Sequence, residues 1–384
     1  MGSAGTSVRL SQRMAERTEL GVGSVCCLLH NMIPGGSARQ WIHLLGRHVE
    51  AGGRATIVAT PGILQADAEA AGIEFAATSW YDRAIELGPE ALRSTLARHD
   101  AAIVHWDHRV MDALEPALDS CGRVALALHQ APEALASWLG PEVMASVRVP
   151  IARALADDRA VVLVRGKWHR ERFATAFDLP ADGFRILPAS IPLDAVPFQP
   201  QLGEPREVMA LMRLAPEKAA IAQLAVELTR QRLAAGRPCR LTIAGEGEWR
   251  EQAEALCRAR LPPQAWRIEA APADPVARLF ASDLVVAQGL TTLEAAAIGR
   301  RVVVARSLDE SRAAGVVLTP ERYDDAARDP FGKPAVSATA GQLWAELLAL
   351  GEDDLGEIRR RVEEHNSLAA ASRALARALA ATAA

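Results

Sequence analysis

The segment ALMRLAPEKAA, from Ala210 to Ala220, follows directly on an apolar run that predicts a buried strand. Its proline predicts the first turn of a helix. Arg213 therefore lies just past the strand, and Lys218 lies at the start of the helix. Two cations beside a helix N-terminus favour the binding of a polyanion, because unpaired backbone amides add to the side-chain charge. The alternative is that both are solvated surface residues.

The same alternation of apolar strand and helix continues on both sides of this segment. It begins at Val22 and runs to Leu187, and it resumes at Val208. The proline-rich stretch from Ile191 to Glu207 interrupts it and is interpreted as an interdomain linker. Strands that are apolar on both faces and separated by helices predict parallel sheets covered on two sides. The predicted fold class is α/β, with two doubly wound halves that face each other across a cleft.

Length and composition agree with a two-domain soluble protein. The chain has 384 residues, of which 50% are apolar and 23% charged, and its net charge is −4. This length exceeds one compact core, and this charge gives no bulk attraction to nucleic acid. Residues 1–20 lack the apolar centre of a signal peptide, and no apolar run of about 18 residues predicts a membrane span. Five cysteines without CxxC spacing indicate reduced thiols and a cytoplasmic location.

Ligands of doubly wound sheets bind beyond the carboxyl ends of the strands, so polar loops at strand ends are candidate site segments. Gly35 and Gly36 follow the first strand and either let a backbone approach a phosphate or sugar, or form a flexible turn. The sequence HWDH, from His105 to His108, has a metal-like pattern around Asp107, but its spacing provides no third converging ligand. His129 follows the next strand and is the better candidate, as a neutral hydrogen-bonding group.

Two loops in the second half have the same character. Gly245-Glu246-Gly247 follows a strand, but Arg250 stands where a dinucleotide fingerprint needs its third glycine, which disfavours nicotinamide and flavin enzymes. In QGLTTLEAAAIG, residues 288–299, Gly289 permits a tight turn and a helix is expected to begin near Thr291. Its amides are suited to a diphosphate and Glu294 to two ribose hydroxyls. The alternative is a capping box in which Glu294 serves only the helix start.

In their order, these segments resemble the family-4 retaining glycosyltransferases of GT-B fold, over nearly the whole chain from about Val22. That family has an R-L-x-x-x-K segment that grips the donor diphosphate, a G-x-G turn, a glycine turn followed by L-x-E-A-x-x-x-G, an N-terminal glycine pair and a histidine after a central strand. The matching residues here are Arg213 and Lys218; Gly245 and Gly247; Gly289, Leu293, Glu294, Ala295 and Gly299; Gly35 and Gly36; and His129.

The resemblance implies that this protein transfers a sugar from a nucleoside-diphosphate sugar with retention of configuration, without a metal or a cofactor. It implies a disordered extension over residues 1–20, an acceptor-side domain over 21–195, a donor-binding domain over 196–355, and a final helical segment over 356–384 that packs back on the first domain. The implied donor-binding residues are Gly35, Gly36, Gly245, Gly247, Gly289, Leu290, Thr291, Thr292 and Glu294. The implied catalytic residues are Arg213, Lys218 and His129.

Three departures from the family pattern stand out. Val286 occupies the place, eight residues before Glu294, where the family usually carries a glutamate that contacts the donor sugar. Pro188-Ala189-Ser190 replaces a P-N-G-x-D motif, and RSLDES replaces a glycine-rich loop after Val304. These differences leave two alternatives open: a nucleotide-sugar-binding protein without transferase activity, or an epimerase or hydrolase on the same fold.

The acceptor is not defined by the sequence and is a glycan, a lipid-linked sugar or a small molecule. The basic stretch RGKWHRER, from Arg165 to Arg172, either contacts an anionic lipid or glycan, which would place the protein peripherally on the inner face of the membrane, or is a solvated helix start.

Overall fold

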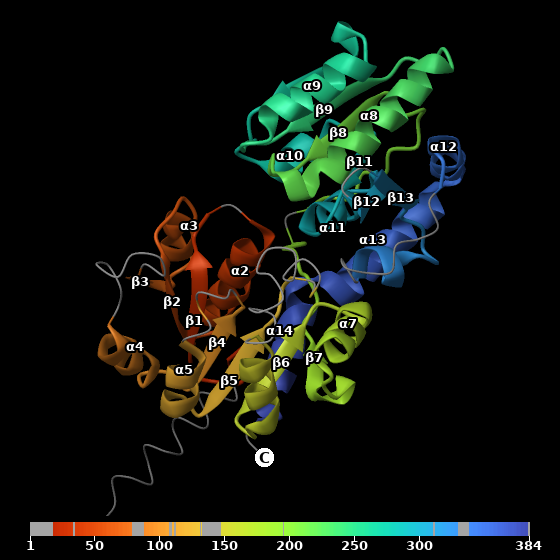
Figure 1. Cartoon of the computed structure of the whole chain (residues 1–384). Helices are drawn as coiled ribbons and strands as arrows, with labels where there is room; N and C mark the ends of the chain where they lie inside the picture. Colours follow the sequence, from red (N-terminus) through yellow and green to blue (C-terminus); the bar gives the residue numbers. More distant parts are fainter. Residues whose placement is uncertain are drawn as a thin grey trace, which may run out of the picture. The chain divides into compact units, whose positions relative to one another are not determined.

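The computed structural model describes residues 18–33, 35–78, 88–106, 110, 113–130, 132, 147–194, 196–309, 312–328 and 338–382. The chain forms two compact units. The first, unit 1, comprises Met1–Pro188 and Leu368–Ala384, and the second, unit 2, comprises Ala189–Ser367. Each unit is an α/β sandwich around a predominantly parallel sheet (Figure 1), which confirms the predicted fold class.

Unit 1 is built on a seven-stranded, wholly parallel sheet in the order β3-β2-β1-β4-β5-β6-β7. Its strands are β1 (Ser24–Asn31), β2 (Arg54–Thr60), β3 (Glu74–Ala77), β4 (Ala101–His105), β5 (Arg123–Ala127), β6 (Ala160–Val164) and β7 (Phe184–Ile186). Its helices are α2 (Gly36–Glu50), α3 (Gln65–Ala70), α4 (Pro89–Leu96), α5 (Leu114–Ser120), α7 (Lys167–Phe177), the short 3-10 helix η2 (Ala181–Gly183) and α14 (Leu368–Ala380).

Both faces of this sheet are buried, because alternate residues of one strand enter two different cores. In β1, Cys27 and Leu29 join the core under α2 and α14, whereas Cys26 and Leu28 join the core on the side of α4 and α5. The unbroken apolar run of β1, residues 25–29, therefore fits a sheet that is covered on both faces. Leu20 also belongs to the first core; most of the expected disordered extension, residues 1–17, lies outside the described residues.

Unit 2 is built on a six-stranded sheet in the order β10-β9-β8-β11-β12-β13. Its strands are β8 (Glu207–Leu211), β9 (Arg240–Ala244), β10 (Trp266–Glu269), β11 (Leu284–Ala287), β12 (Arg301–Asp309) and β13 (Arg312–Val317). Its helices are α8 (Ala219–Ala234), α9 (Arg250–Arg260), α10 (Pro275–Phe280), α11 (Leu290–Ala297), α12 (Ala340–Ala349) and α13 (Glu352–Asn366), with short turns η3 (Pro216–Lys218), η4 (Pro263–Ala265) and η5 (Asp324–Arg328).

One element of unit 2 was not predicted from the sequence. β12 continues past Ala305 to Asp309, and β13 pairs with it antiparallel, so that Val304 faces Val316 in register. Residues 306–309, the described part of the RSLDES segment where a glycine-rich loop was expected, thus continue strand β12. These residues are mostly polar and gave no strand signal. Their strand conformation depends on pairing with β13, which the composition does not show.

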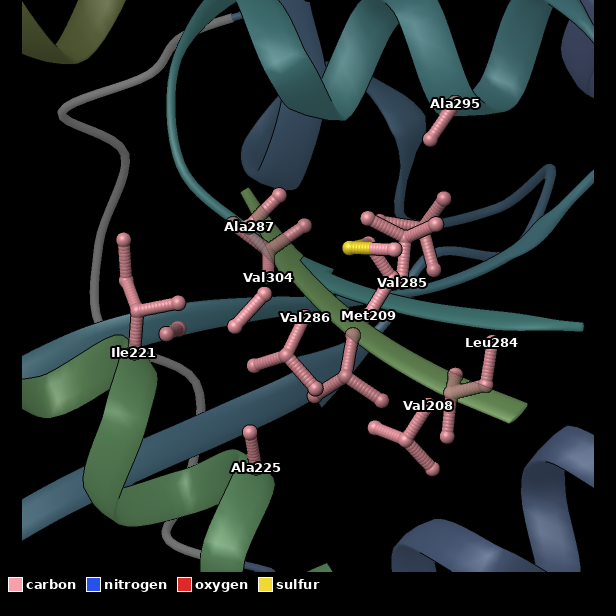
Figure 2. Packing of buried hydrophobic residues seen from close by; sticks show 14 of the residues in the cluster. Val208, Met209, Ile221, Ala225, Leu284, Val285, Val286, Ala287, Ala295 and Val304 are labelled. Carbon is pink, nitrogen blue, oxygen red and sulfur yellow. The ribbon is translucent and has the colours of Figure 1, made fainter. Parts of the chain in front are cut away.

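The core of unit 2 lies on both faces of its sheet. Figure 2 shows Val285 and Val286 of β11 among packed apolar side chains, with Ile221 and Ala225 of α8 on one side of the sheet and Ala295 of α11 on the other. Neighbouring residues of a strand point to opposite faces, so β11 supplies both layers. The segment Ala189–Phe198 also packs here, through Ile191, among others.

The last helix, α14, belongs to unit 1 and packs on α2, β5 and β6. Its buried face is formed by Leu368, Ala371, Leu375, Ala378 and Leu379, which repeat at helical spacing. All five cysteines are buried and free, and burial raises the pKa of the Cys121 thiol to about 12. Among the helices that the structure describes, none is both long enough and apolar enough to cross a membrane.

Candidate functional site

Each sheet contains one point at which the strand order reverses. In unit 1 the reversal lies between β1 and β4, and in unit 2 it lies between β8 and β11. The chain leaves such neighbouring strands in opposite directions, which opens a crevice beyond their carboxyl ends where ligands bind. The candidate residues after β8 and β11 therefore lie at the position that the topology favours.

Lys218 and Gln288 bring the two loops of the unit 2 reversal together. Lys218 is the N-terminal capping residue of α8, and its Nζ donates a hydrogen bond to Gln288 Oε1 at 3.3 Å. Gln288 Nε2 in turn donates to the carbonyl oxygen of Ala305 at 2.7 Å. Burial lowers the pKa of Lys218, Glu217 raises it and Arg213 lowers it further. The ammonium group is thus held at the carboxyl edge of β8, β11 and β12 by one neutral amide.

Arg213 is exposed and forms an ion pair with Glu217, one helical turn along the chain. An exposed pair of this kind contributes about 0–1 kcal/mol, so Arg213 can exchange Glu217 for a phosphate at little cost. The structure places both predicted cations in the same loop, Lys218 half-buried and Arg213 at the surface.

The Gly245-Glu246-Gly247 turn contacts protein backbone. A Cβ on Gly245 would lie 1.8 Å from the carbonyl oxygen of Met212, and one on Gly247 would lie 2.1 Å from that of Leu214. Both glycines have positive φ, 155° and 146°. The Leu214 amide donates to the Glu246 carbonyl at 2.8 Å, which ties this turn to the loop that carries the two cations. The glycines thus have a structural explanation.

Helix α11 begins with amides that no side chain caps. Its N-terminal capping residue is Gly289, at φ 66° and ψ −134°, a conformation that glycine alone adopts readily. Thr291 lies inside the helix, so the capping-box alternative is wrong and Glu294 lies in the second turn. Thr292 is 2% exposed, and its Oγ1 has no hydrogen-bond partner among the described residues.

Val286 is a residue of the hydrophobic core. It is fully buried in β11 (Figure 2), and only Gln288 and Gly289 separate this strand from α11. A carboxylate at position 286 would therefore be enclosed in the sheet. The departure from the family pattern is thus a core valine in place of the sugar-binding glutamate, at the same spacing from Glu294.

In unit 1, Gly35 is the N-terminal capping residue of α2, which begins at Gly36. Gly35 has an extended backbone at φ −172°, and a Cβ there would meet only the Ile33 carbonyl oxygen, at 3.9 Å. The local structure does not require a glycine at this position. No side chain caps this helix, so its first amides remain available at the carboxyl edge of β1.

His129 is part of a buried polar network that the sequence did not reveal. Its Nδ1 accepts a hydrogen bond from Arg165 NH2 at 2.5 Å, and Arg165 NH1 donates to Gln40 Oε1 at 2.5 Å. Gln40 also donates to the carbonyl oxygen of Pro188 at 3.0 Å. The one available signal was that Arg165 follows the apolar strand sequence VVLV directly.

The protonation of His129 follows from this network. A guanidinium can only donate, so Nδ1 must accept and the ring proton of neutral His129 sits on Nε2. Nε2 is buried without a partner within the described residues. Burial, together with the positive charge of Arg165 and the neighbouring His105 and His169, lowers the pKa of His129 well below its ordinary value. His129 thus offers a neutral N–H donor.

The HWDH segment is only partly described. The His105 ring meets the His129 ring edge-on at 4.3 Å, whereas Asp107 and His108 lie outside the described residues. In the described part of the chain, no cluster of three or more His, Cys, Asp or Glu side chains is arranged to hold a metal ion. The basic stretch is also divided, because Arg165 and His169 are buried while Lys167 is exposed.

His169 is expected to make the stability of unit 1 dependent on pH. Its Nδ1 accepts a hydrogen bond from the Arg165 amide at 3.1 Å, and its Nε2 donates one to the Gln130 carbonyl oxygen at 2.8 Å. A second ring proton would have to bind Nδ1, where it would point at the amide N–H of Arg165. Burial lowers the pKa of His169 to about 3. The folded protein therefore binds fewer protons than the unfolded chain between about pH 3 and 6.5, and stability falls as pH falls through this window.

From pH 7 to pH 5 this single group should lower the free energy of unfolding by about 2 kcal/mol. Urea unfolding at the two pH values measures the loss, and His169→Gln should reduce the pH dependence by that amount. An NMR titration in which the His169 ring protonates near pH 6.5 in the folded protein would contradict the expectation.

Comparison with known proteins agrees with this architecture. No family model and no curated protein sequence matches the chain. HepE from Anabaena, solved in complex with UDP and glucose, superposes with a TM-score of 0.70 over 93% of this chain and 99% of its own, at 12% identity. A glycosyltransferase from Rickettsia africae ESF-5 superposes with a TM-score of 0.64 over 91% of this chain and 96% of its own, at 11% identity. WaaG, a glycosyltransferase involved in lipopolysaccharide biosynthesis, superposes with a TM-score of 0.56 over 92% of this chain and 99% of its own, at 12% identity.

At these identities the likeness establishes the fold, and the fold is GT-B. Function has to be argued from the site itself, since one fold carries many activities.

Proposed function

We propose that this protein is a glycosyltransferase that uses a nucleoside-diphosphate sugar as donor and binds its nucleotide in unit 2. The observation that carries the proposal is the contact between Lys218 and Gln288, 3.3 Å long, at the reversal of the unit 2 sheet. It joins a cationic loop to the uncapped N-terminus of α11, and these two features together suit a diphosphate. HepE was solved with UDP-glucose, which supports a nucleotide-sugar ligand for this fold.

The proposed mechanism follows the movement of charge. Cleavage of the sugar–phosphate bond leaves negative charge on the diphosphate, which Lys218, Arg213 and the amides of residues 289–292 would stabilise without a metal or a cofactor. Glu294 would accept hydrogen bonds from ribose hydroxyls. We propose retention of configuration: the acceptor hydroxyl attacks the anomeric carbon on the face from which the diphosphate leaves, and its proton passes to the departing phosphate. His129 would donate a hydrogen bond from its Nε2–H to a sugar hydroxyl.

The competing proposal is a nucleotide-sugar-binding protein that does not transfer the sugar. The core residue Val286 favours it, because no carboxylate is available at this position to hold the donor sugar. The two proposals predict the same nucleotide binding. Release of nucleoside diphosphate and formation of a glycosylated product in the presence of acceptors distinguish them.

Thermal-shift titration with UDP, GDP, TDP and ADP, each with and without EDTA, tests the nucleotide site. We expect one diphosphate to stabilise the protein equally well in EDTA, and Lys218→Ala to abolish the effect. Lys167→Ala is the matched control, because it removes an exposed lysine at the start of α7. If no diphosphate stabilises the protein, both proposals are wrong.

A further inference from the structure

Arg165 is a buried cation whose role the proposed nucleotide site does not explain. It is 6% exposed and is the first residue after β6, at the carboxyl edge of the unit 1 sheet. Burial lowers the pKa of its guanidinium to about 9, so it keeps its charge at neutral pH. Its hydrogen bonds go only to neutral groups: Gln40, His129 and, at 3.5 Å, the carbonyl oxygen of Pro188.

Within the part of the chain that the structure describes, no carboxylate pairs with Arg165. A buried charge is strongly unfavourable unless it is paired, because the interior of a protein replaces water poorly. A permanent positive charge without a counter-charge is therefore expected where an anion arrives from outside the chain. The position supports this, since ligands of such sheets bind at the edge where Arg165 lies.

Two other buried arginines show what a structural role looks like in this protein. Arg301 donates to the carbonyl oxygens of Gln201, Leu202, Gly203 and Leu350. Arg300 likewise donates to backbone carbonyl oxygens. Burial lowers the pKa of both guanidiniums, and the carboxylate of Asp283 raises it. These guanidiniums fasten backbone segments and have an acidic neighbour. Among the residues that the structure describes, Arg165 has one long carbonyl contact and no acidic neighbour.

The groups around Arg165 are donors as well. Neutral His129 carries its proton on Nε2, which is buried and has no partner in the described residues. Gln40, whose Oε1 accepts from Arg165, lies on α2, the helix that begins just beyond the carboxyl end of β1. Nδ1 of His129 faces the guanidinium, so its Nε2–H lies on the other side of the imidazole ring. Both groups are donors, and donors of this kind bind the oxygens of a carboxylate or phosphate.

We propose that Arg165 and His129, held in place by Gln40, form a binding site in unit 1 for a compact oxyanion, a carboxylate or phosphate group carried by a carbohydrate. That the anion is part of a carbohydrate rests on the proposed transferase function, and the site then selects an acidic sugar as one of the two substrates. The fixed charge would discriminate against the neutral sugar of the same shape.

Pairs of sugars that differ in one acidic group test this proposal. Binding of glucose, glucuronate and glucose 6-phosphate to the wild-type protein is measured by calorimetry in the presence of UDP, together with UDP-glucose against UDP-glucuronate. We expect at least one acidic sugar to bind about ten-fold or more tightly than its neutral partner. A preference among the free sugars points to the acceptor, and a preference between the UDP-sugars points to the donor.

The variants Arg165→Gln and Arg172→Gln remove the same charge from the same basic stretch. The preference for the acidic sugar should disappear in R165Q and persist in R172Q, because Arg172 is not buried and its guanidinium stacks on Trp168. Equal binding of acidic and neutral sugars by the wild-type protein would overturn the proposal even if R165Q did not fold. So would a preference that survives in folded R165Q. Failure of UDP to bind, with the acidic preference intact, would instead refute the proposed nucleotide site.

Discussion

Replacement of Lys218 by alanine is expected to lower kcat/KM for the nucleoside-diphosphate sugar by about 100- to 1,000-fold, or about 3–4 kcal/mol of transition-state stabilisation. Lys218 is the one half-buried cation in the loop after β8, and its ammonium already lies at 3.3 Å from an amide of the β11–α11 loop. A charge in this position acts on the departing diphosphate from surroundings that contain little water, where it is worth more than an exposed charge.

Steady-state kinetics with saturating acceptor measure this effect, and single-turnover release of the nucleoside diphosphate separates chemistry from product release. Lys167→Ala is the control and should retain wild-type turnover. The fold should survive in K218A, since Lys218 makes one 3.3 Å hydrogen bond and sits at the end of a helix. Normal turnover in K218A would remove the main support for the nucleotide site.

Much of unit 2 could be predicted from the sequence because its signals are local. The apolar run of β11 and the proline at the start of η3 each identify an element from a few neighbouring residues. β13 was missed because its sequence, RAAGVV, shows no clear alternation of apolar and polar residues, and its strand conformation depends on pairing with β12. The helix that was expected to begin near Thr291 begins at Leu290.

The candidate site shows the same limit. Lys218 was found from its place in a strand–helix junction, but its hydrogen bond to Gln288, 70 residues away in the sequence, could not be predicted. Arg165 was assigned to a basic surface stretch, because one-dimensional charge patterns do not reveal which side chain turns inward. Its burial is a consequence of where β6 ends in the sheet and of the partners that α2 and β5 provide 125 and 36 residues away in the sequence. Such contacts are known only once the topology is known.

Replacement of Gly245 by alanine is expected to destabilise unit 2 by about 3–5 kcal/mol, which corresponds to a fall in its unfolding temperature of about 10 °C. Two costs add together. The new Cβ would lie 1.8 Å from the carbonyl oxygen of Met212, so backbone must move. The position also has φ 155°, which strains any residue with a side chain.

This result would decide between two interpretations of the G-x-G sequence. If Gly245 were needed only for the close approach of a ligand, its replacement would leave the ligand-free protein stable. Gly245 instead lies against the Met212 carbonyl oxygen of the protein itself, so its replacement should lower stability without any ligand. Calorimetric unfolding of G245A measures the loss, and Gly203→Ala is the control, since φ is not positive there and no atom lies within 4 Å of the added Cβ. An unchanged unfolding temperature with UDP binding abolished would contradict the structural interpretation. The expected loss of stability would instead mean that the turn contributes to the nucleotide site indirectly, by holding the loop of Arg213 and Lys218 in place.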